Sequence, residues 1–174
     1  MKFISSYKGI KPQISKSAFI ADNTSIIGDV KIGDETGIWF NVVIRGDVAP
    51  IRIGNRTNIQ DGTVIHVTRG GHPTNIGDEV TVGHGAILHA CTLEDKSFVG
   101  MGATILDNAV VKTGAFVAAG ALVTANKIVP SGELWAGNPA KKLRNLKKEE
   151  IKFITISADN YVKHVHEYLE EKND

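Results

Sequence analysis

The sequence predicts an all-β solenoid, a parallel β-helix of hexapeptide repeats, followed by one C-terminal α-helix. Three observations support this fold class. Aliphatic residues recur every six positions along most of the chain, a small or β-branched residue comes four positions after most of them, and glycine often follows the aliphatic directly. Neither an α-helix nor an alternating strand repeats every six residues. Short strands joined at tight corners do, and the pattern is typical of hexapeptide β-helices.

The aliphatic residues of the repeat mark the strands of the predicted solenoid. They are Ile14, Ile20, Ile26, Ile32, Ile38, Ile44, Ile53, Ile59, Ile65, Ile76, Val82, Leu88, Leu93, Val99, Ile105, Val111, Val117 and Val123. If three such rungs close one coil, these eighteen rungs make about six coils, stacked roughly 4.8 Å apart. Each coil buries its aliphatic side chains only against its neighbours, so the core is a one-dimensional stack.

Two insertions and one break interrupt the repeat. The spacing between Ile44 and Ile53 has three extra residues, around Pro50. The spacing between Ile65 and Ile76 has five, and we expect a loop over residues 68–75. Insertions in a β-helix form loops on one face, often the functional face. After Val123 the pattern ends, and the prolines and glycines of residues 125–144 predict turns.

An amphipathic helix is predicted from about Lys147, lying along an outer face of the prism. Its apolar residues follow helical spacing: Ile151, Ile154, Ala158, Tyr161, Val162, Val165 and Leu169. Glu149 and Glu150 suit the positive end of the helix dipole. We therefore expect a β-helix domain over residues 1–145 and a helical segment over residues 146–174.

Composition limits the partners. The net charge is +1 with no basic run, which argues against nucleic acid. The single cysteine, Cys91, excludes an internal disulfide, fits a reducing compartment and is expected to be a small packing residue. The start MKFISSYKG has no apolar segment of signal-peptide length, and no stretch is long enough to span a membrane. We expect a soluble cytoplasmic protein without membrane association.

Two histidines form a column on one face of the predicted prism. Carrying the repeat through the insertions places three aliphatic residues on that face: Ile44, Ile65 and Leu88. The residues that follow them are Arg45, His66 and His89, which should stack. Two imidazoles on layers about 4.8 Å apart can converge on one zinc ion.

A third histidine, His84, falls on the preceding face, where it should stack above Asp61. The corner between His84 and His89 turns the two side chains away from each other. A second subunit removes this difficulty, and three prisms in a closed ring would complete three identical sites. The same docking brings Arg45 of one subunit near Asp61 of the next. The alternative for the three histidines is that they are grouped by coincidence. The alternatives for Arg45 and Asp61 are a surface ion pair and a purely structural pair at the interface.

Four stretches resemble the γ-class carbonic anhydrase-like proteins of the hexapeptide-repeat superfamily: Arg45-Gly46-Asp47, residues 58–66, residues 82–91 and residues 135–141. The first three are specific to that family, whereas the fourth also occurs in hexapeptide acyltransferases. The resemblance covers nearly the whole chain. It implies a homotrimer of left-handed β-helices.

The resemblance also implies the composition of the site. His66 and His89 of one subunit and His84 of its neighbour would hold zinc, with iron or cobalt as alternatives. Gln60 would hydrogen-bond the metal-bound hydroxide that attacks carbon dioxide to give bicarbonate. In the family pattern Arg45 and Asp61 pair across the subunit interface. Tyr161 resembles a family tyrosine that reaches the site.

Turnover is expected to be slow. Well-studied family members carry glutamates in the loops beside the site, where this chain has Val48, Arg69 and His72. Proton release should then limit the rate, with His72 as a possible relay, because histidine changes protonation near neutral pH.

Two alternatives remain. A CoA-dependent acyltransferase would use His84 or His89 as a general base, but it accounts for one histidine rather than three. A non-catalytic trimer would keep the metal for assembly, as a scaffold or binding subunit.

Overall fold

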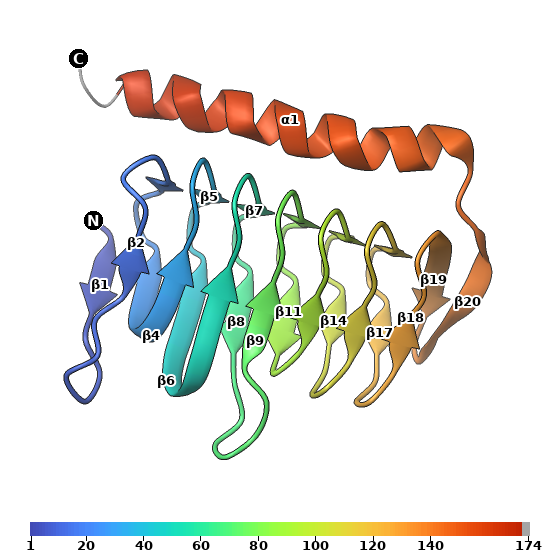
Figure 1. Cartoon of the computed structure of the whole chain (residues 1–174), viewed down its shortest axis with the longest axis horizontal. Coiled ribbons are helices and arrows are strands. Elements are labelled where there is room, and N and C mark those ends of the chain that lie inside the picture. Colours follow the sequence, from blue (N-terminus) through green and yellow to red (C-terminus); the bar gives the residue numbers. More distant parts are fainter. Residues whose placement is uncertain (172–174) are drawn as a thin grey trace.

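The computed structural model describes residues 1–171 and shows a left-handed parallel β-helix of about seven turns with one long helix along its side (Figure 1). The predicted fold class is confirmed. The division into segments 1–145 and 146–174 stays a prediction, and its last three residues, 172–174, lie outside the described part of the chain.

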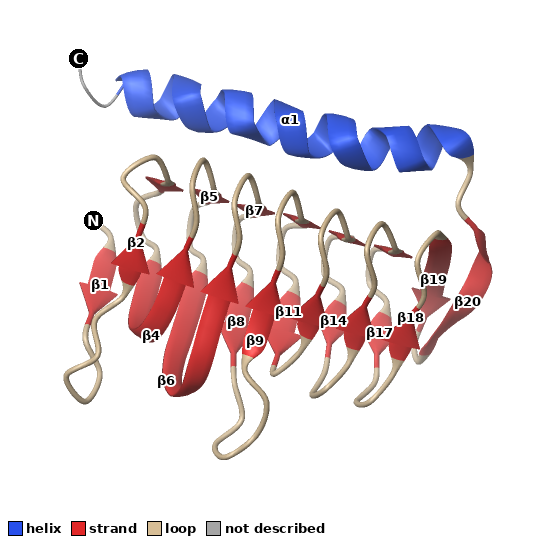
Figure 2. Ribbon diagram, in the orientation of Figure 1, coloured by secondary structure: helices blue, strands red, loops and turns tan. Residues whose placement is uncertain are grey.

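The strands form two sheets (Figure 2). The twelve-stranded sheet contains β1 (Phe3–Ser5), β2 (Gln13–Ile14), β4 (Ser25–Ile32), β6 (Val43–Ile53), β8 (Val64–His66), β9 (Thr74–Ile76), β11 (Ile87–His89), β12 (Thr92–Leu93), β14 (Thr104–Ile105), β15 (Val110–Val111), β17 (Leu122–Val123) and β18 (Ile128–Val129). The eight-stranded sheet contains β3 (Phe19–Ile20), β5 (Gly37–Ile38), β7 (Asn58–Ile59), β10 (Thr81–Val82), β13 (Phe98–Val99), β16 (Phe116–Val117), β19 (Glu133–Gly137) and β20 (Ala140–Asn145).

The twelve-stranded sheet covers two faces of the prism because β6 bends between them. Val43 and Ile44 at the start of β6 pair with β8, whereas residues 51–53 at its end pair with β9. The eight-stranded sheet is the third face. Among the strands of residues 1–171, the pairings within the coils are parallel, and only β20 runs antiparallel, against β19.

The six-residue aliphatics fill the prism, as predicted. Ile44, Ile65 and Leu88 are Cα partners in consecutive layers and are fully buried. Threonines close several corners, because their hydroxyls replace missing backbone partners: Thr57 donates to the carbonyl of Gly77 at 2.8 Å. Gly54 must lack a side chain at such a corner, since a Cβ there would lie 2.6 Å from the carbonyl carbon of Gly77.

The insertion around Pro50 is not a loop, which corrects the sequence prediction. β6 is one continuous strand of 11 residues that runs beside β4, with a register shift between Gly28 and Val30. Arg52 and Asp29 tie the two strands with an ion pair of 2.7 Å. The second insertion does form a loop, residues 67–73 between β8 and β9, which projects from the prism (Figure 1).

The segment 125–144, predicted as turns, contains β18, β19 and β20, so the estimate of six coils was one too few. Val129 and Trp135 continue the six-residue phase and pair with Val111 and Val117 of the preceding coil. The solenoid begins close to the N-terminus, because β1 already pairs with β4.

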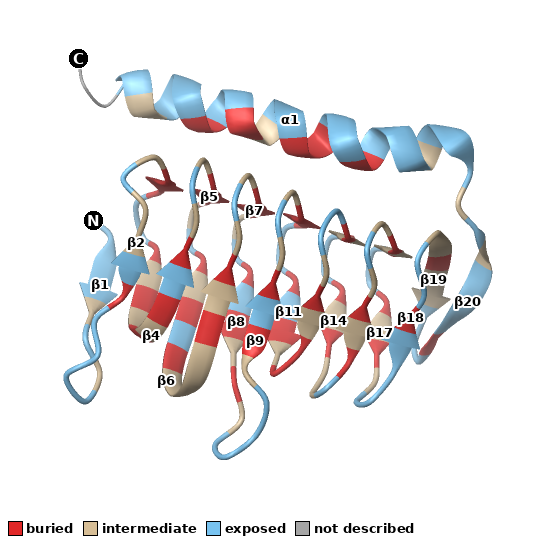
Figure 3. Ribbon diagram, in the orientation of Figure 1, coloured by how far each residue is buried: buried red, intermediate tan, exposed pale blue. Residues whose placement is uncertain are grey.

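The helix α1 (Lys148–Glu171) begins one residue after the predicted position. It contacts β3, β5, β7 and β10 of the eight-stranded sheet, and its buried residues alternate with exposed ones along the ribbon (Figure 3). Four of them were predicted from the helical spacing: Ile154, Ala158, Val162 and Val165. Ile151, also predicted on this face, is exposed. No helix within residues 1–171 combines the length and apolarity that a membrane crossing needs.

Candidate metal centre

His66 and His89 stack at the ends of β8 and β11, where they are Cα partners in adjacent layers. Their ring centroids lie 5.3 Å apart. Nδ1 of His66 and Nε2 of His89 face each other at 3.3 Å. The stacking that the repeat phase predicts is therefore present, and one nitrogen of each ring points into a shared space.

The outward nitrogen of each ring meets a carboxylate. Nε2 of His66 lies 3.1 Å from Asp47, and Nδ1 of His89 lies 2.9 Å from Asp107. Burial raises the pKa of Asp47, but hydrogen bonds from Arg45 and His66 outweigh it, and the pKa lies below its ordinary value. Hydrogen bonds from the Thr68 hydroxyl and then from His89 lower the pKa of Asp107. Both carboxylates are thus ionised at neutral pH and accept the N–H of a histidine.

This arrangement favours a cation between the rings. A neutral imidazole that donates one N–H to a carboxylate keeps a lone pair on the other nitrogen. The facing nitrogens of His66 and His89 would then both be acceptors at 3.3 Å. Two nitrogen ligands of a tetrahedral zinc ion with bonds of about 2.05 Å are separated by roughly 3.3 Å. The spacing and the chemistry of the donors fit such an ion.

His84 lies elsewhere, on the turn after β10, at a corner of the prism. Its Nδ1 is 2.8 Å from Asp61, and both side chains are close to half exposed. Gly85 follows in the left-handed region, at φ +66°, which permits the tight corner. The contact with Asp61 leaves Nε2 of His84 free to act as a ligand.

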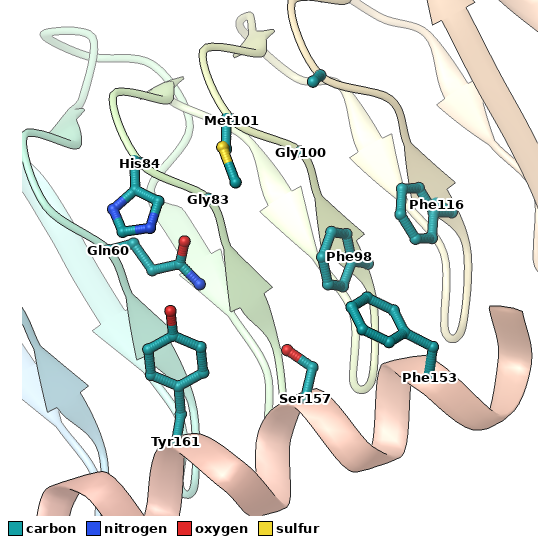
Figure 4. A pocket seen from close by; sticks show the side chains of 11 residues that line it. Gln60, Gly83, His84, Phe98, Gly100, Met101, Phe116, Phe153, Ser157 and Tyr161 are labelled. Atoms are coloured by element: carbon teal, nitrogen blue, oxygen red, sulfur yellow. The ribbon is translucent and has the colours of Figure 1, made fainter.

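Gln60 and Tyr161 accompany His84 rather than the other two histidines. All three side chains line one cavity between the eight-stranded sheet and α1 (Figure 4). Gln60 is 5% exposed and its amide donates to Asn58 at 3.0 Å. Burial, followed by the charge of Asp61, raises the pKa of Tyr161.

The predicted site residues thus fall into two groups within one chain. His66 and His89 form the first, and His84, Gln60 and Tyr161 form the second. Within residues 1–171 of a single chain, no three or more histidine, cysteine or acidic side chains are grouped as metal ligands.

The predicted partners Arg45 and Asp61 do not meet within one chain. Arg45 pairs with Asp47 at 2.6 Å, whereas Asp61 contacts His84. The Arg45–Asp61 contact was predicted between subunits and stays a prediction.

Sequence reasoning missed the roles of Asp47, Asp107 and Thr68. For Asp107 a signal existed, because it follows His89 by 18 residues, the length of one coil without insertions. A search for acidic residues one coil away from each histidine would have found it. Thr68 gave no such signal, because it lies in the inserted loop.

The remaining candidates behave as side chains of the core or surface. Burial raises the pKa of Cys91 to about 12, which suits a packing residue rather than a nucleophile. His72 is exposed in the loop after β8. His164 and His166 are exposed on α1, where they contact Glu167 and Glu35.

Comparison with known proteins shows close relatives, although no family model matches the chain. A carbonic anhydrase of Geobacillus kaustophilus is 54% identical over 156 residues, which cover 90% of this chain and 85% of that protein. The mitochondrial gamma carbonic anhydrase 1 of Arabidopsis thaliana is 54% identical over 155 residues, 86% of this chain. The chain spans only 56% of the length of that relative.

Among solved structures, a hexapeptide transferase family protein of Anaplasma phagocytophilum superposes with a TM-score of 0.92 at 50% identity. The match covers 95% of this chain and 98% of that one. The chain belongs to the γ-class carbonic anhydrase-like family of hexapeptide-repeat β-helix proteins.

Proposed function

We propose that the chain is a carbonic anhydrase-like lyase that interconverts carbon dioxide and bicarbonate at a metal centre shared between subunits of a homotrimer. One observation carries the proposal. The facing nitrogens of His66 and His89 are 3.3 Å apart, and both outer nitrogens are held by carboxylates. That arrangement suits two neutral ligands of one metal ion.

The third ligand is His84 of a neighbouring subunit. Asp61 engages its Nδ1, so His84 is prepared as a neutral Nε2 ligand in the same way as His89. The surface beside His66 and His89 supports contact with another subunit. Val64 and Ile87, Cα partners on the outside of that face, are 39% and 45% exposed. Neighbouring exposed aliphatics are typical of a surface that a partner covers.

Three imidazoles with an open fourth position suit zinc, with iron or cobalt as alternatives. Bound there, zinc would lower the pKa of a coordinated water to about 7 and so supply a nucleophile for carbon dioxide at neutral pH. Residues of the chain would orient the nucleophile, border the substrate and join the subunits. Gln60 would orient the nucleophile through its amide, Tyr161 would border the substrate, and Arg45 would pair with Asp61 of the next subunit.

Release of a proton to solvent is the slow step in this proposal. Val48 stands beside the Arg45–Asp47 segment and cannot carry a proton. His72 is the titratable side chain in the neighbouring loop and is exposed. We expect hydration of carbon dioxide at a rate limited by proton transfer.

The proposal is tested by metal analysis of purified variants, coupled to a carbon dioxide hydration assay. His66→Ala and His84→Ala should each lose metal and activity. His164→Ala, on the exposed face of α1, is the matched control and should keep both.

Co-assembly of the two inactive variants then tests the sharing of the site. With equal amounts and random mixing, a site is intact when one chain supplies His66 and His89 and its neighbour supplies His84, which is about one site in four. Recovery of about a quarter of the metal and activity is expected. If both single variants keep full metal content, the proposed ligands are wrong. If metal is fully bound but carbon dioxide is not hydrated, the scaffold or acyltransferase function replaces this proposal.

A further inference from the structure

Another cavity, of about 430 Å³, lies at the end of the prism opposite the N-terminus (Figure 1). It is bordered by the corner that joins β17 to β18 and by the terminal hairpin of β19 and β20. Its lining residues are Thr124, Lys127, Trp135, Pro139, Ala140, Lys141 and Lys142. The volume falls within the range of small-molecule sites, about 300–1,000 Å³.

This cavity is separate from the metal centre. Among residues 1–171, its lining includes no histidine and neither Gln60 nor Tyr161. His89 ends β11, and the next two layers of the same face are β14 and β17. At about 4.8 Å per layer, the cavity begins roughly 10 Å beyond His89 along the axis of the prism. A ligand bound here does not occupy the position proposed for carbon dioxide.

The cavity gathers positive charge in a chain whose net charge is only +1. Three of its described lining residues are lysines, and none is acidic. Lys142 is paired with Glu133, whose carboxylate lies 2.7 Å from Nζ. Within residues 1–171, Lys127 and Lys141 have no ion-pair partner. Two ammonium groups at one cavity thus lack a counter-charge.

Trp135 supplies a flat apolar surface to the same cavity. Its indole packs against the aliphatic core and remains partly exposed. The indole Nε1 donates to Glu133 at 2.9 Å, so this N–H is already satisfied within the chain. Pro139 and Ala140 add apolar atoms to the lining. Such a surface suits a planar ring, which stacks on an indole in an offset arrangement.

The two kinds of lining select a ligand with two parts. A neutral ring alone would leave the unpaired ammonium groups unused, and an inorganic anion alone would leave the indole uncovered. A carboxylate balances one lysine. A phosphate monoester carries about −1.5 to −2 charges at neutral pH and can accept hydrogen bonds from two. Lysine binds phosphate through its compact positive charge.

We propose that this cavity binds a phosphate monoester of a small planar aromatic alcohol, with its ring against Trp135 and its phosphate paired with Lys127 and Lys141. The inference goes beyond the proposed carbonic anhydrase-like function. It does not depend on that function, because no proposed metal ligand takes part.

The test uses the full-length protein as purified and ligand-observed NMR titration with phenyl phosphate, benzoate, phenol and inorganic phosphate. Because Lys127 and Lys141 are exposed, each ionic contact should change the affinity by no more than about fivefold. Phenyl phosphate should therefore bind about tenfold more tightly than phenol, with benzoate between them. Inorganic phosphate, which lacks the ring, should bind more weakly than phenyl phosphate. No binding of phenyl phosphate, or an affinity equal to that of phenol or of inorganic phosphate, would overturn the proposal.

Three lysine variants locate the phosphate. Lys127→Gln and Lys141→Gln should each weaken the binding of phenyl phosphate about two- to fivefold and leave that of phenol unchanged. Lys31→Gln is the matched control, because Lys31 is an exposed lysine of β4 that does not line the cavity. It should leave both affinities unchanged. Equal weakening by all three variants would reveal non-specific attraction to a cationic surface, and no effect of the first two would rule out the pairing.

Tryptophan fluorescence locates the ring. The chain has two tryptophans, so Trp39→Phe leaves Trp135 as the only one. Phenyl phosphate should change the emission of this variant, with the same dissociation constant as in the NMR titration. Emission that stays constant at saturation would show that the ring does not stack on Trp135, which contradicts the proposal.

A last variant separates the cavity from the metal centre, because a phosphate can also bind a metal ion. His66→Ala, with folding checked by circular dichroism, removes a proposed metal ligand. The affinity for phenyl phosphate should be the same in this variant as in the parent, whatever metal the parent contains. A loss of binding would place the anion at the metal and refute the site.

Discussion

Replacing Asp107 by asparagine should weaken metal binding without removing a ligand. Asp107 accepts the N–H of His89 at 2.9 Å and also the hydroxyl of Thr68. Its charge favours the tautomer of His89 with the proton on Nδ1, in which Nε2 carries a lone pair. An asparagine can instead present its NH₂ group to Nδ1, which moves the ring proton to Nε2 and blocks the ligand atom.

The expected size of the effect follows from the exposure of the pair. Removing a carboxylate that orients a metal-bound histidine commonly lowers metal affinity about 10- to 100-fold. His89 and Asp107 have side-chain exposures of 32% and 42%, so water competes for both groups. We therefore expect a loss near the lower limit, about tenfold, or about 1.4 kcal/mol of binding free energy.

The assay is competitive titration of the metal-free protein with zinc and a chelating dye. Asp95→Asn is a matched control, because Asp95 accepts a backbone N–H from Asp78 and does not contact a histidine. It should leave the dissociation constant unchanged. If Asp107→Asn binds zinc as tightly as the parent while His66→Ala does not bind it, the carboxylate does not set the tautomer and the reasoning fails.

Three further changes test the proton path, the helix and the core. His72→Ala should make carbon dioxide hydration more dependent on added imidazole buffer, and a rate independent of buffer would show that proton release is not limiting. Hydrogen bonds from Arg144 lower the pKa of Glu150 to about 2, so Glu150→Gln should reduce thermal stability above about pH 4.5, with the difference shrinking as the pH falls toward 2. Leu88→Ala should cost about 3 kcal/mol in urea unfolding and lower Tm by roughly 6–12 °C, whereas the exposed Ile128→Ala should change stability by less than about 0.5 kcal/mol.

The solenoid could be predicted because every coil repeats the same physical requirement. Ile65 and Leu88 occupy the same position in successive layers, and the period of six brings them there despite an insertion. The last coil was missed because its corners lack the small residue: Lys127 and Glu133 stand where alanine stands in earlier coils. Only the inward residues Val129 and Trp135 keep the phase there.

The fate of an insertion is harder to predict than its presence. The extra residues around Pro50 extend β6 because β4 runs beside them as a partner, with Gly46 lying against the backbone of Asp29. The residues after His66 have no such neighbour and leave the prism as a loop. Whether an insertion extends a strand or forms a loop depends on pairing between segments that are far apart in the sequence. The six-residue period alone does not predict that pairing.

The same distinction applies to the candidate site. The phase of the repeat predicted the stacking of His66 and His89, because strand residues in register must share a face. It could not predict which nitrogen each ring presents, since that depends on Asp47 and Asp107, carboxylates on other coils. The contact between Thr68 and Asp107 could not be predicted from the repeat either, because it joins a residue of the inserted loop to a later coil.

The corner of the β-helix explains why the proposed metal centre needs more than one chain. His84 sits on the turn that joins two faces, paired with Asp61, whereas His66 and His89 lie at the strand ends of the next face. If a second subunit supplies His84 as proposed, the complete site exists only in the assembled protein. If metal binds the assembly more tightly than the free chain, the difference between the two binding free energies stabilises the assembly. The apparent affinity for metal should therefore rise with protein concentration, and chelation should favour dissociation.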